Sequence, residues 1–331
     1  MKFKSDVDIH KVVVSVCIMA YNHEKYIAKA LDSVLMQQGN FKLEILLGED
    51  GSSDTTATIV RDYAQRYPKI IRAFFHDPAD KLFINGRQTG RRNFIHNLTH
   101  ARGNYIALLD GDDCWTDAKK LDKQIRFLED NKEYVACCHS AICVDSLGNS
   151  TGDFLQHNIG DKEYFDFDIY DILKKNPIPS LSVVFRNPHF KKLPDWFYKT
   201  EMADWPLHIL NARLGKVRYF SENMASYRLH DCGAWADFRA DPRLVLQAEI
   251  SVWSLISKDH EYVGYLKYIR FLIDTNYKKI IKLNLKNNMY NEAILNLAKR
   301  NKDKNQIFDF YSAKTMLKIV KKYIKTRIAK H

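Results

Sequence analysis

Three aspartates directly follow an apolar run in the sequence Y-I-A-L-L-D-G-D-D, at Asp110, Asp112 and Asp113. Carboxylates this close together repel one another unless a cation lies among them. They are also the ligands that a hard divalent cation takes when it keeps its waters and binds substrate phosphates. The cluster therefore indicates a Mg2+ or Mn2+ site for a phosphorylated ligand. A polar turn with Asp117 capping the next helix would also explain these residues.

Two earlier apolar runs also end in polar residues. The first ends at Tyr21 and Asn22, and the second at residues 49–52, with the sequence E-D-G-S. Ligands bind beyond the carboxyl ends of the strands in open α/β sheets, so these segments and residues 110–113 are expected in one crevice. The chain contains no G-x-G-x-x-G or G-x-x-x-x-G-K-[ST] motif, which disfavours a dinucleotide-binding fold and a P-loop.

The elements that must position these residues alternate between strands and helices. Apolar β-branched runs predict strands, and apolar residues at helical spacing predict the helices between them. The predicted strands are 12–20, 42–48, 70–76 and 105–110, and the predicted helices are 26–38, 55–68 and 89–103. This alternation predicts an α/β fold with a Rossmann-like, mostly parallel sheet and helices on both faces.

Downstream of these elements the pattern is less regular. An amphipathic helix is predicted at 115–131, followed by a hairpin at 134–149 with Gly148 in its turn. Residues 225–235 are predicted to follow a short strand. From about residue 240 the pattern changes to long helices.

The positive charge of the chain is concentrated at its C-terminal end. The net charge is +11, and residues 278–331 contain 15 Lys and Arg against 3 Asp and Glu, a net of +12. The other residues carry 36 basic and 37 acidic side chains, a net of −1. A polyanionic surface, either anionic lipid or nucleic acid, is therefore the expected partner of this end of the chain.

The sequence also indicates the cellular compartment. No apolar run is long enough to cross a membrane, and the short N-terminal run is predicted as a strand rather than a signal peptide. None of the six cysteines forms a C-x-x-C pair, so neither a zinc site nor a disulfide framework is expected. The cysteines are Cys17, Cys114, Cys137, Cys138, Cys143 and Cys232. We expect a cytoplasmic protein.

In their order along the chain, the motifs resemble those of family 2 glycosyltransferases with the GT-A fold. The matches are a first strand ending in Y-N, an acidic D-G-S-x-D turn, an R-N helix and a D-x-D motif, and they cover about residues 12–235. The resemblance implies an inverting enzyme that moves a sugar from a nucleotide-sugar, with a UDP-sugar favoured, to an acceptor hydroxyl. It also implies a Mn2+ or Mg2+ cofactor. The implied domains are a GT-A domain at 1–240, with a nucleotide-binding half at about 12–115 and an acceptor-side half at about 116–240, and a helical, basic region at 241–331.

The resemblance also implies roles for individual residues. Asp50 would accept a hydrogen bond from the uracil imide, while Tyr21 and Asn22 would frame the base and ribose. Arg92 would lie near the sugar or phosphates and Asp110 near the ribose, although Asn22 could equally be a cap and Arg92 a surface ion-pair partner. The residues implied for nucleotide-sugar binding are Ala20, Tyr21, Asn22, Glu24, Asp50, Arg92, Asp110, Gly111, Asp112, Trp205 and Arg228, and those for the metal are Asp112, Asp113 and His230.

Inverting transfer needs a carboxylate that takes the proton from the acceptor hydroxyl as it attacks the anomeric carbon. In the family this base is the second acid of an E-D or D-D pair, commonly followed by Trp, which points to Asp204 before Trp205. Ala203 stands where the family often has an acid, and Glu201 is the rival base. Asp204 could also simply cap the helix that begins at Trp205-Pro206.

The segment Y-R-L-H-D-C-G-A-W resembles the Y-R-x-H segment that folds over the donor in this family. His230 could be a third metal ligand, a diphosphate contact or a structural residue. Trp205 and Trp235 could stack on sugar rings or belong to the core. Gly233 would allow this segment to move as a lid.

The C-terminal residues 315–330 form a basic amphipathic pattern, as found on membrane surfaces. The apolar side holds Leu317, Val320, Ile324 and Ile328, and the basic side holds Lys318, Lys321, Lys322 and Lys325. A helix docked on the body with a solvated lysine face would show the same pattern. A cell-surface polysaccharide or lipid-linked glycan as acceptor would favour a position on the inner face of the cytoplasmic membrane.

Other functions remain open from the sequence. A nucleic-acid-binding protein could use the basic tail, but the body lacks the aromatic-basic interleaving of such proteins, so no nucleic acid is expected. A non-catalytic nucleotide-sugar-binding scaffold would not need Asp204. A nucleotidyltransferase shares the metal and nucleotide chemistry, but the series of motifs does not favour it.

Overall fold

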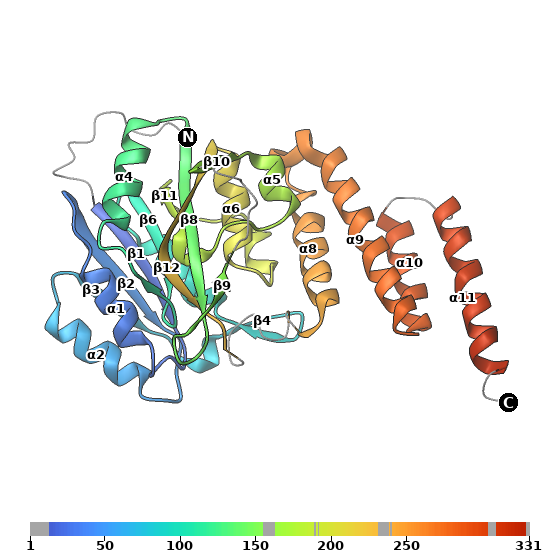
Figure 1. The fold of residues 1–331 in the computed structure, drawn as a ribbon, viewed down its shortest axis with the longest axis horizontal. Coiled ribbons are helices and arrows are strands. Elements are labelled where there is room, and N and C mark those ends of the chain that lie inside the picture. The colour runs from blue at the N-terminus through green and yellow to red at the C-terminus, as the bar shows by residue number, and fades with distance from the viewer. Residues whose placement is uncertain are drawn as a thin grey trace. The chain divides into compact units, whose positions relative to one another are not determined.

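The structure is a computed structural model that describes residues 13–154, 163–188, 190, 192–230, 238, 240–303 and 309–328. The chain divides into two compact units, Met1–Asp231 and Cys232–His331. The first unit contains the strands and the second consists of helices (Figure 1).

A large sheet forms the centre of the first unit (Figure 1). Its strands are β1 (Val13–Ala20), β2 (Lys42–Glu49), β3 (Ile71–Phe75), β6 (Tyr105–Asp110), β7 (Cys114–Trp115), β8 (Tyr134–Val144), β9 (Ser150–Asp153), β10 (Tyr164–Phe167), β11 (Val184–Arg186) and β12 (Lys216–Arg228). In the described part of the unit the order is β10-β12-β8-β11-β6-β1-β2-β3, with β7 beside β12 and β9 beside β8. A separate hairpin consists of β4 (Leu82–Ile84) and β5 (Arg87–Thr89).

The first half of the sheet is parallel, as the alternation of strands and helices predicts. Strands β3, β2, β1 and β6 are parallel neighbours. In their register Met19 lies opposite Asp110, and Ala20 lies opposite Glu49. The carboxyl ends of β1, β2 and β6 therefore meet at one edge of the sheet, and the predicted α/β fold class is confirmed.

The second half of the sheet is mixed. Strand β11 is antiparallel to both β6 and β8, and β12 is parallel to β8. The predicted hairpin is present as β8 and β9, with Gly148 at a φ of 92° in the turn. The strand predicted to be short before residue 225 is in fact β12, which has 13 residues and ends at Arg228. Three register shifts against β8 allow this long strand to continue through irregular pairing.

Helices cover both faces of the sheet in the first unit. They are α1 (Ile27–Leu35), α2 (Thr56–Arg66), α3 (Arg91–His100), α4 (Lys120–Asp130), α5 (Ile169–Lys174) and α6 (Asp204–Ala212). Alternate β1 residues such as Val14 and Val16 share one core cluster with residues of α1, α2 and α4. Helix α3 packs on the opposite face, where Asn93 occupies the space that a side chain at Gly48 would fill and donates to the Gly48 carbonyl at 2.8 Å.

The second unit is built from α8 (Pro242–Ile256), α9 (Leu266–Lys286), α10 (Tyr290–Asp303) and α11 (Phe310–Ile328). Asp241 caps α8 by accepting the Arg243 amide at 2.9 Å, which explains why the helical pattern begins there. Within the helices that the structure describes, none combines the length and apolar character needed to span a membrane.

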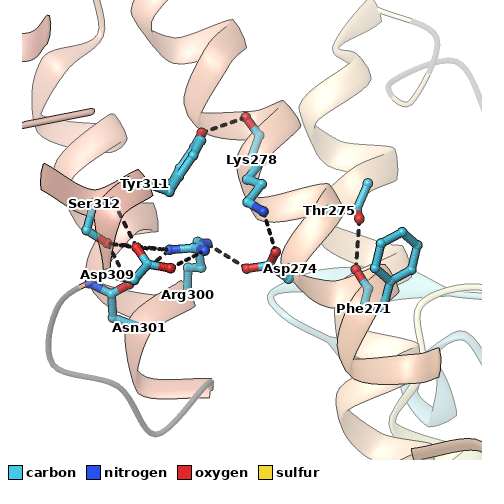
Figure 2. Close-up of polar contacts among 9 residues, drawn as sticks. All are labelled: Phe271, Asp274, Thr275, Lys278, Arg300, Asn301, Asp309, Tyr311 and Ser312. Atoms are coloured by element: carbon cyan, nitrogen blue, oxygen red, sulfur yellow. Dashed lines mark hydrogen bonds and ion pairs between the residues drawn. The ribbon is translucent and has the colours of Figure 1, made fainter. Parts of the chain in front are cut away.

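A buried arginine joins the last three helices of this unit (Figure 2). Arg300 of α10 is 1% exposed and forms ion pairs with Asp274 of α9 and with Asp309, both at 2.7 Å. Asp309 also accepts the Ser312 amide at 2.8 Å, at the start of α11. Because a guanidinium offers five donors, one side chain can connect three helices without leaving buried charge uncompensated.

A lysine is fully buried in the first unit. Lys120, the first residue of α4, has no exposed surface, and its ammonium donates to Gln124 at 2.9 Å and lies 4.0 Å from the centre of the Trp115 ring. Burial lowers the pKa of Lys120 to about 7, although the nearby Cys137 and Cys138 oppose this shift. The charged form is therefore held at a cost in stability.

We predict that this lysine makes stability depend on pH. The native pKa lies below that of a free lysine, so between about pH 7 and pH 10 the unfolded chain binds a proton that the native chain lacks, and stability rises with pH. Replacing Lys120 by Met removes this contribution. The melting temperature of K120M relative to wild type should therefore be highest at or below pH 7 and fall by roughly 5 °C toward pH 10.

The measurement is a series of thermal unfolding curves from pH 6 to pH 10. K119M is the matched control, because Lys119 is the preceding residue and its side chain is exposed. Parallel pH curves for K120M and wild type would contradict the prediction.

Candidate active site

The D-x-D turn lies at the carboxyl ends of β1 and β6. The Gly111 amide donates to the Met19 carbonyl at 2.8 Å, which fixes the turn against β1. A Cβ atom at Gly111 would lie 2.8 Å from Nδ1 of His23, so this position tolerates only glycine without rearrangement. The close approach brings His23 to the turn, where its Nε2 is 3.6 Å from Oδ2 of Asp112.

Asp112 and His230 are in direct contact. His230 Nε2 lies 2.8 Å from Oδ2 of Asp112, and both side chains are largely buried. Burial alone would raise the pKa of Asp112, but the hydrogen bond with His230 and the charges of His23 and His230 hold it below its usual value. Burial lowers the pKa of His23, against the opposing effect of Asp112. The structure thus brings the predicted pair together and adds His23.

The other two aspartates of the turn lie in a strongly negative environment. Burial and the charges of Asp112 and Asp204 raise the pKa of Asp110 to about 8. Burial and the charges of Asp112 and Asp110 also raise the pKa of Asp113 well above its usual value. Oδ2 of Asp113 is buried and receives no hydrogen bond from the residues that the structure describes.

Arg228 holds the turn from behind. Its amide donates to Oδ1 of Asp113 at 2.7 Å, and its guanidinium donates to the carbonyls of Asp112 at 3.0 Å and Asp145 at 2.8 Å. The guanidinium also lies 4.4 Å from the centre of the Tyr26 ring. This side chain, implied by the resemblance to bind the donor, is thus engaged with backbone that supports the D-x-D turn.

The residues present fit a divalent cation that is shared with a phosphate ligand. Across the described ranges no group of three or more His, Cys, Asp or Glu side chains is arranged as a metal site. Mg2+ and similar ions are, however, commonly held by one or two carboxylates together with substrate phosphates. Asp112 supplies such a carboxylate beside His230, and the bare Oδ2 of Asp113 is a buried acceptor that a cation would satisfy.

A second polar corner lies at the end of β2. Asp50 is buried, and its Oδ2 is 3.6 Å from the ammonium of Lys81, which is itself buried. The Lys81 ammonium lies 3.3 Å from the centre of the Tyr21 ring. Burial raises the pKa of Asp50, and Lys81 opposes that shift. Asp50 and Lys81 thus present an acceptor and a donor side by side next to the half-exposed ring of Tyr21.

The side chains of Asn22 and Glu24 connect two loops. Asn22 has a φ of 55°, and its Oδ1 accepts the Ser53 amide at 2.9 Å. Glu24 accepts both the amide and the hydroxyl of Thr55, at 3.1 and 2.7 Å. These contacts join the loop after β1 to the loop after β2, so both residues help to shape the crevice.

Two further residues implied by the resemblance lie near this corner. Ala20 is buried, and its carbonyl accepts the Asp50 amide at 2.9 Å. Arg92 is exposed and forms an ion pair with Asp80 at 2.7 Å. Its guanidinium is thus occupied at the surface in this structure.

Asp204 is the first residue of α6, and its charge acts on the D-x-D turn. Its charge contributes to the raised pKa of Asp110. Oδ2 of Asp204 accepts hydrogen bonds from Asn176 at 2.8 Å and from Ser180 at 3.2 Å. Both bonds reach the same oxygen, and the described residues give Oδ1 no hydrogen bond, so that oxygen can accept a proton.

The rival base and the tryptophan lie in different settings. Glu201 accepts a hydrogen bond from Asn85 in the turn of the β4–β5 hairpin. Trp205 is 1% exposed and donates to the Ile172 carbonyl at 2.6 Å, so its ring packs in the core and offers no open face for a sugar. Trp235 and Gly233 lie outside the described residues.

Several residues that shape this site are not found from the sequence, among them His23, Lys81, Asn176, Ser180 and the buried Arg91. His23 and Lys81 stand in segments that look like solvated turns, and their burial depends on partners 30 or more residues away. Arg91 stands next to Arg92 in the R-N motif, and the sequence alone does not tell which of the two is buried. The sequence does contain one indication for Lys81. It lies between the predicted strand at 70–76 and the predicted helix at 89–103, and this connection must pass the edge of the sheet where the strands have their carboxyl ends.

Comparisons with known proteins agree with this fold. A family model described as glycosyl transferase family 2 matches residues 15–189. An uncharacterized protein of Mycobacterium tuberculosis is 33% identical over 233 residues, which cover 69% of this chain and 62% of that protein. EpsE of Bacillus subtilis, provisionally named a glycosyltransferase, is 32% identical over 138 residues, 41% of this chain and 45% of its own. The chain thus spans less than two thirds of these relatives.

Two solved structures share the fold at low sequence identity. TarS 1-349 of S. aureus in complex with UDP has a TM-score of 0.54 and 15% identity, covering 80% of this chain and 70% of TarS. The mannosyltransferase PcManGT of Pyrobaculum calidifontis, in complex with GDP-Man and Mn2+, has a TM-score of 0.51 and 15% identity, covering 96% and 88%. The predicted GT-A type of fold is therefore confirmed.

Proposed function

The chain belongs to glycosyl transferase family 2, and on this premise we propose that it is an inverting, metal-dependent glycosyltransferase. It moves a sugar from a nucleotide-sugar to an acceptor hydroxyl. The observation that carries the proposal is the placement of Asp204, whose Oδ2 is held by Asn176 and Ser180 and whose charge acts on Asp110 of the D-x-D turn, because it puts a candidate base near a candidate diphosphate site. A non-catalytic binding scaffold would not need that second carboxylate.

Asp204 is the proposed general base. Asn176 and Ser180 fix Oδ2, which leaves Oδ1 to take the proton of the acceptor hydroxyl while its oxygen attacks the anomeric carbon. Attack from the face opposite the leaving group inverts the configuration, by the same geometric logic as in inverting glycosidases. Glu201 is disfavoured because its carboxylate is bound to the hairpin at Asn85.

Asp112 and His230, with Asp113 nearby, would hold the Mn2+ or Mg2+ ion. When bound, such an ion offsets the negative charge that builds up on the nucleoside diphosphate leaving group. The Mn2+ in the PcManGT complex supports the choice of a divalent cation. Arg228 keeps the turn in place through its contacts with the Asp112 carbonyl and the Asp113 carboxylate.

Asp50 and Lys81 are proposed to read the base of the donor. An imide offers an N–H group next to a carbonyl oxygen, which matches an acceptor carboxylate beside a donor ammonium. Uracil has this pattern, as do thymine and guanine, whereas adenine and cytosine have no N–H group next to a carbonyl oxygen. Tyr21 would stack on the ring, and the UDP complex of TarS supports uridine as the nucleoside.

The acceptor is proposed to be a cell-surface polysaccharide or a lipid-linked glycan, reached from the inner face of the cytoplasmic membrane. Leu317 and Val320 of α11 are 56% and 48% exposed, and the neighbouring Lys318 and Lys321 are exposed as well. Ile319 is instead buried in a small helical core. A mixed apolar and basic surface of this kind favours anionic lipid. The side chains at positions 322–328, including Ile324 and Lys325, lie outside those that the structure describes.

The first prediction tests the reaction. UDP-sugars with Mn2+ should raise the melting temperature of the wild-type protein, and a screen of nucleotide-sugars should identify one donor that is transferred. D204N should reduce transfer by about 1,000-fold or more, because no group remains to accept the proton, while UDP with Mn2+ still raises its melting temperature. E201Q is the control, with transfer close to wild type. Loss of transfer in E201Q but not in D204N would move the base to Glu201.

The failure of every nucleotide-sugar to shift the melting temperature, together with strong salt-dependent binding of RNA or DNA, would reject the proposed function. D112A provides an independent reading of the metal site. It should weaken both Mn2+ and UDP binding, because the ion and the diphosphate share that carboxylate.

The second prediction tests base recognition. K81M should weaken UDP binding by about 10-fold, the scale of one charge-assisted hydrogen bond. The measurement is calorimetric titration with UDP, CDP and ADP, and K69M is the control because Lys69 is exposed in the turn before β3. Unchanged UDP affinity in K81M would show that Lys81 only neutralises Asp50.

The third prediction tests the membrane surface. The wild-type protein should sediment with vesicles of phosphatidylglycerol, and less so as salt rises. K318E/K321E should weaken this binding by about 10-fold or more, since each lysine near an anionic surface contributes roughly 1 kcal/mol. K299E/K302E makes the same change of charge on exposed residues of α10 and is the control. Equal loss in both variants would indicate non-specific attraction.

A further inference from the structure

Arg91 is buried at the point where the two halves of the proposed site meet. It is the first residue of α3 and is 1% exposed. Its terminal nitrogen Nη2 donates to the carbonyls of Thr200 and Met202 and, at 2.9 Å, to Oγ1 of Thr200. These residues form the turn that leads directly into α6, whose first residue is Asp204.

The environment of the guanidinium is more than a set of backbone contacts. Burial lowers the pKa of Arg91 to about 9, and the charge of Asp204 opposes that shift. Nε and Nη1 of Arg91 are buried and have no hydrogen-bond partner in the part of the chain that the structure describes. The Phe197 ring lies 5.1 Å below the guanidinium carbon. A buried cation thus lies within electrostatic reach of Asp204 and holds the turn before it.

The segment that carries Arg91 has both of its ends close to Asp50. Lys81 stands just before β4 and pairs with Asp50 at 3.6 Å. Gly90 stands just after β5, and a Cβ atom there would lie 3.8 Å from Oδ2 of Asp50. Between them, Asn85 at the hairpin turn donates to Glu201. Residues 81–91 therefore connect the corner proposed to read the base with the turn that carries the proposed catalytic base.

We propose that Arg91 is a positioning residue for Asp204, acting through the Thr200–Met202 turn and through its charge. This inference rests on the proposed function, since it concerns the same site. Asn176 and Ser180 hold the carboxylate of Asp204 from one side, while Arg91 fixes the backbone from which it projects. Because Arg91 is buried and acts through the Thr200–Met202 turn, its loss is expected to affect the step that uses Asp204 and to leave nucleotide binding intact.

The test compares R91M, R91K and T200V with wild type in the full chain. R91M should lower kcat for transfer by about 100-fold, the scale expected when a reacting group is misplaced by about 1 Å, while the KM for the donor and the Kd for UDP stay within about 2-fold. R91K should recover part of the loss, because it keeps the charge but not the planar fork. T200V, which removes one acceptor of Arg91, should lower kcat by a smaller factor and covers the case in which R91M does not fold.

A second measurement does not depend on activity. Amide hydrogen exchange at residues 200–206 should be faster in R91M and R91K than in wild type, and exchange at 20–24 and 49–52 should be unchanged. R102M is the control, because Arg102 is exposed shortly after the end of α3. If wild type shows no transfer with any donor, the proposed function fails, while the exchange data still decide whether Arg91 holds the turn.

Two results would overturn the inference. A kcat within about 3-fold of wild type in both R91M and T200V would show that Asp204 does not need Arg91. A parallel loss of UDP affinity in R91K would instead assign Arg91 to donor binding or to general stability.

Discussion

The structure depends on placing several carboxylates together in a small and largely buried space. Burial raises the pKa of the Tyr227 phenol, and the charges of Asp113, Asp110, Asp112 and Asp204 raise it further. Such a cluster costs free energy, because each buried charge disfavours the next. The fold meets this cost partly with His230 at Asp112 and with the Arg228 amide at Asp113. The rest of the negative charge is what a cation and its phosphate ligand would compensate.

This constraint explains why so many polar side chains near the crevice bind the backbone of neighbouring segments. Asn22 and Glu24 join two loops, and Arg228 donates to carbonyls of two segments, at Asp112 and at Asp145 and Ser146. A site that must keep like charges close requires rigid support, since relaxation of any loop would let the carboxylates move apart. Residues that a motif assigns to the ligand can therefore act one step away from it, by fixing those that touch it.

The sequence predicts the parallel half of the sheet well, because the β-branched runs and helical spacing are local signals. The edge that gathers Asp50 and the D-x-D turn follows from that half, since parallel strands must end on one side. The antiparallel insertion of β11 and the burial of Lys81 could not be predicted. A three-residue strand has little periodicity, and Lys81 is buried only because Asp50 and Tyr21 come from distant segments. The family resemblance implies Trp205 at the ligand, but it lies in the core, where its indole N–H donates to a carbonyl of α5, and this partner could not be predicted either.

Buried arginines connect distant segments at several places in the chain. In the first unit Arg186 donates to the Tyr134 carbonyl and the Tyr105 hydroxyl, at 2.9 and 3.1 Å, and Arg91 and Arg228 bind carbonyls next to the acidic cluster. In the second unit Arg300 joins three helices. A lysine could not replace them, because its three donors radiate from one point whereas a planar guanidinium reaches several acceptors in fixed directions. The chain thus uses the same physical device to fix its core, its proposed site and its helical unit, and at Arg91 that device lies beside the carboxylate on which the chemistry would depend.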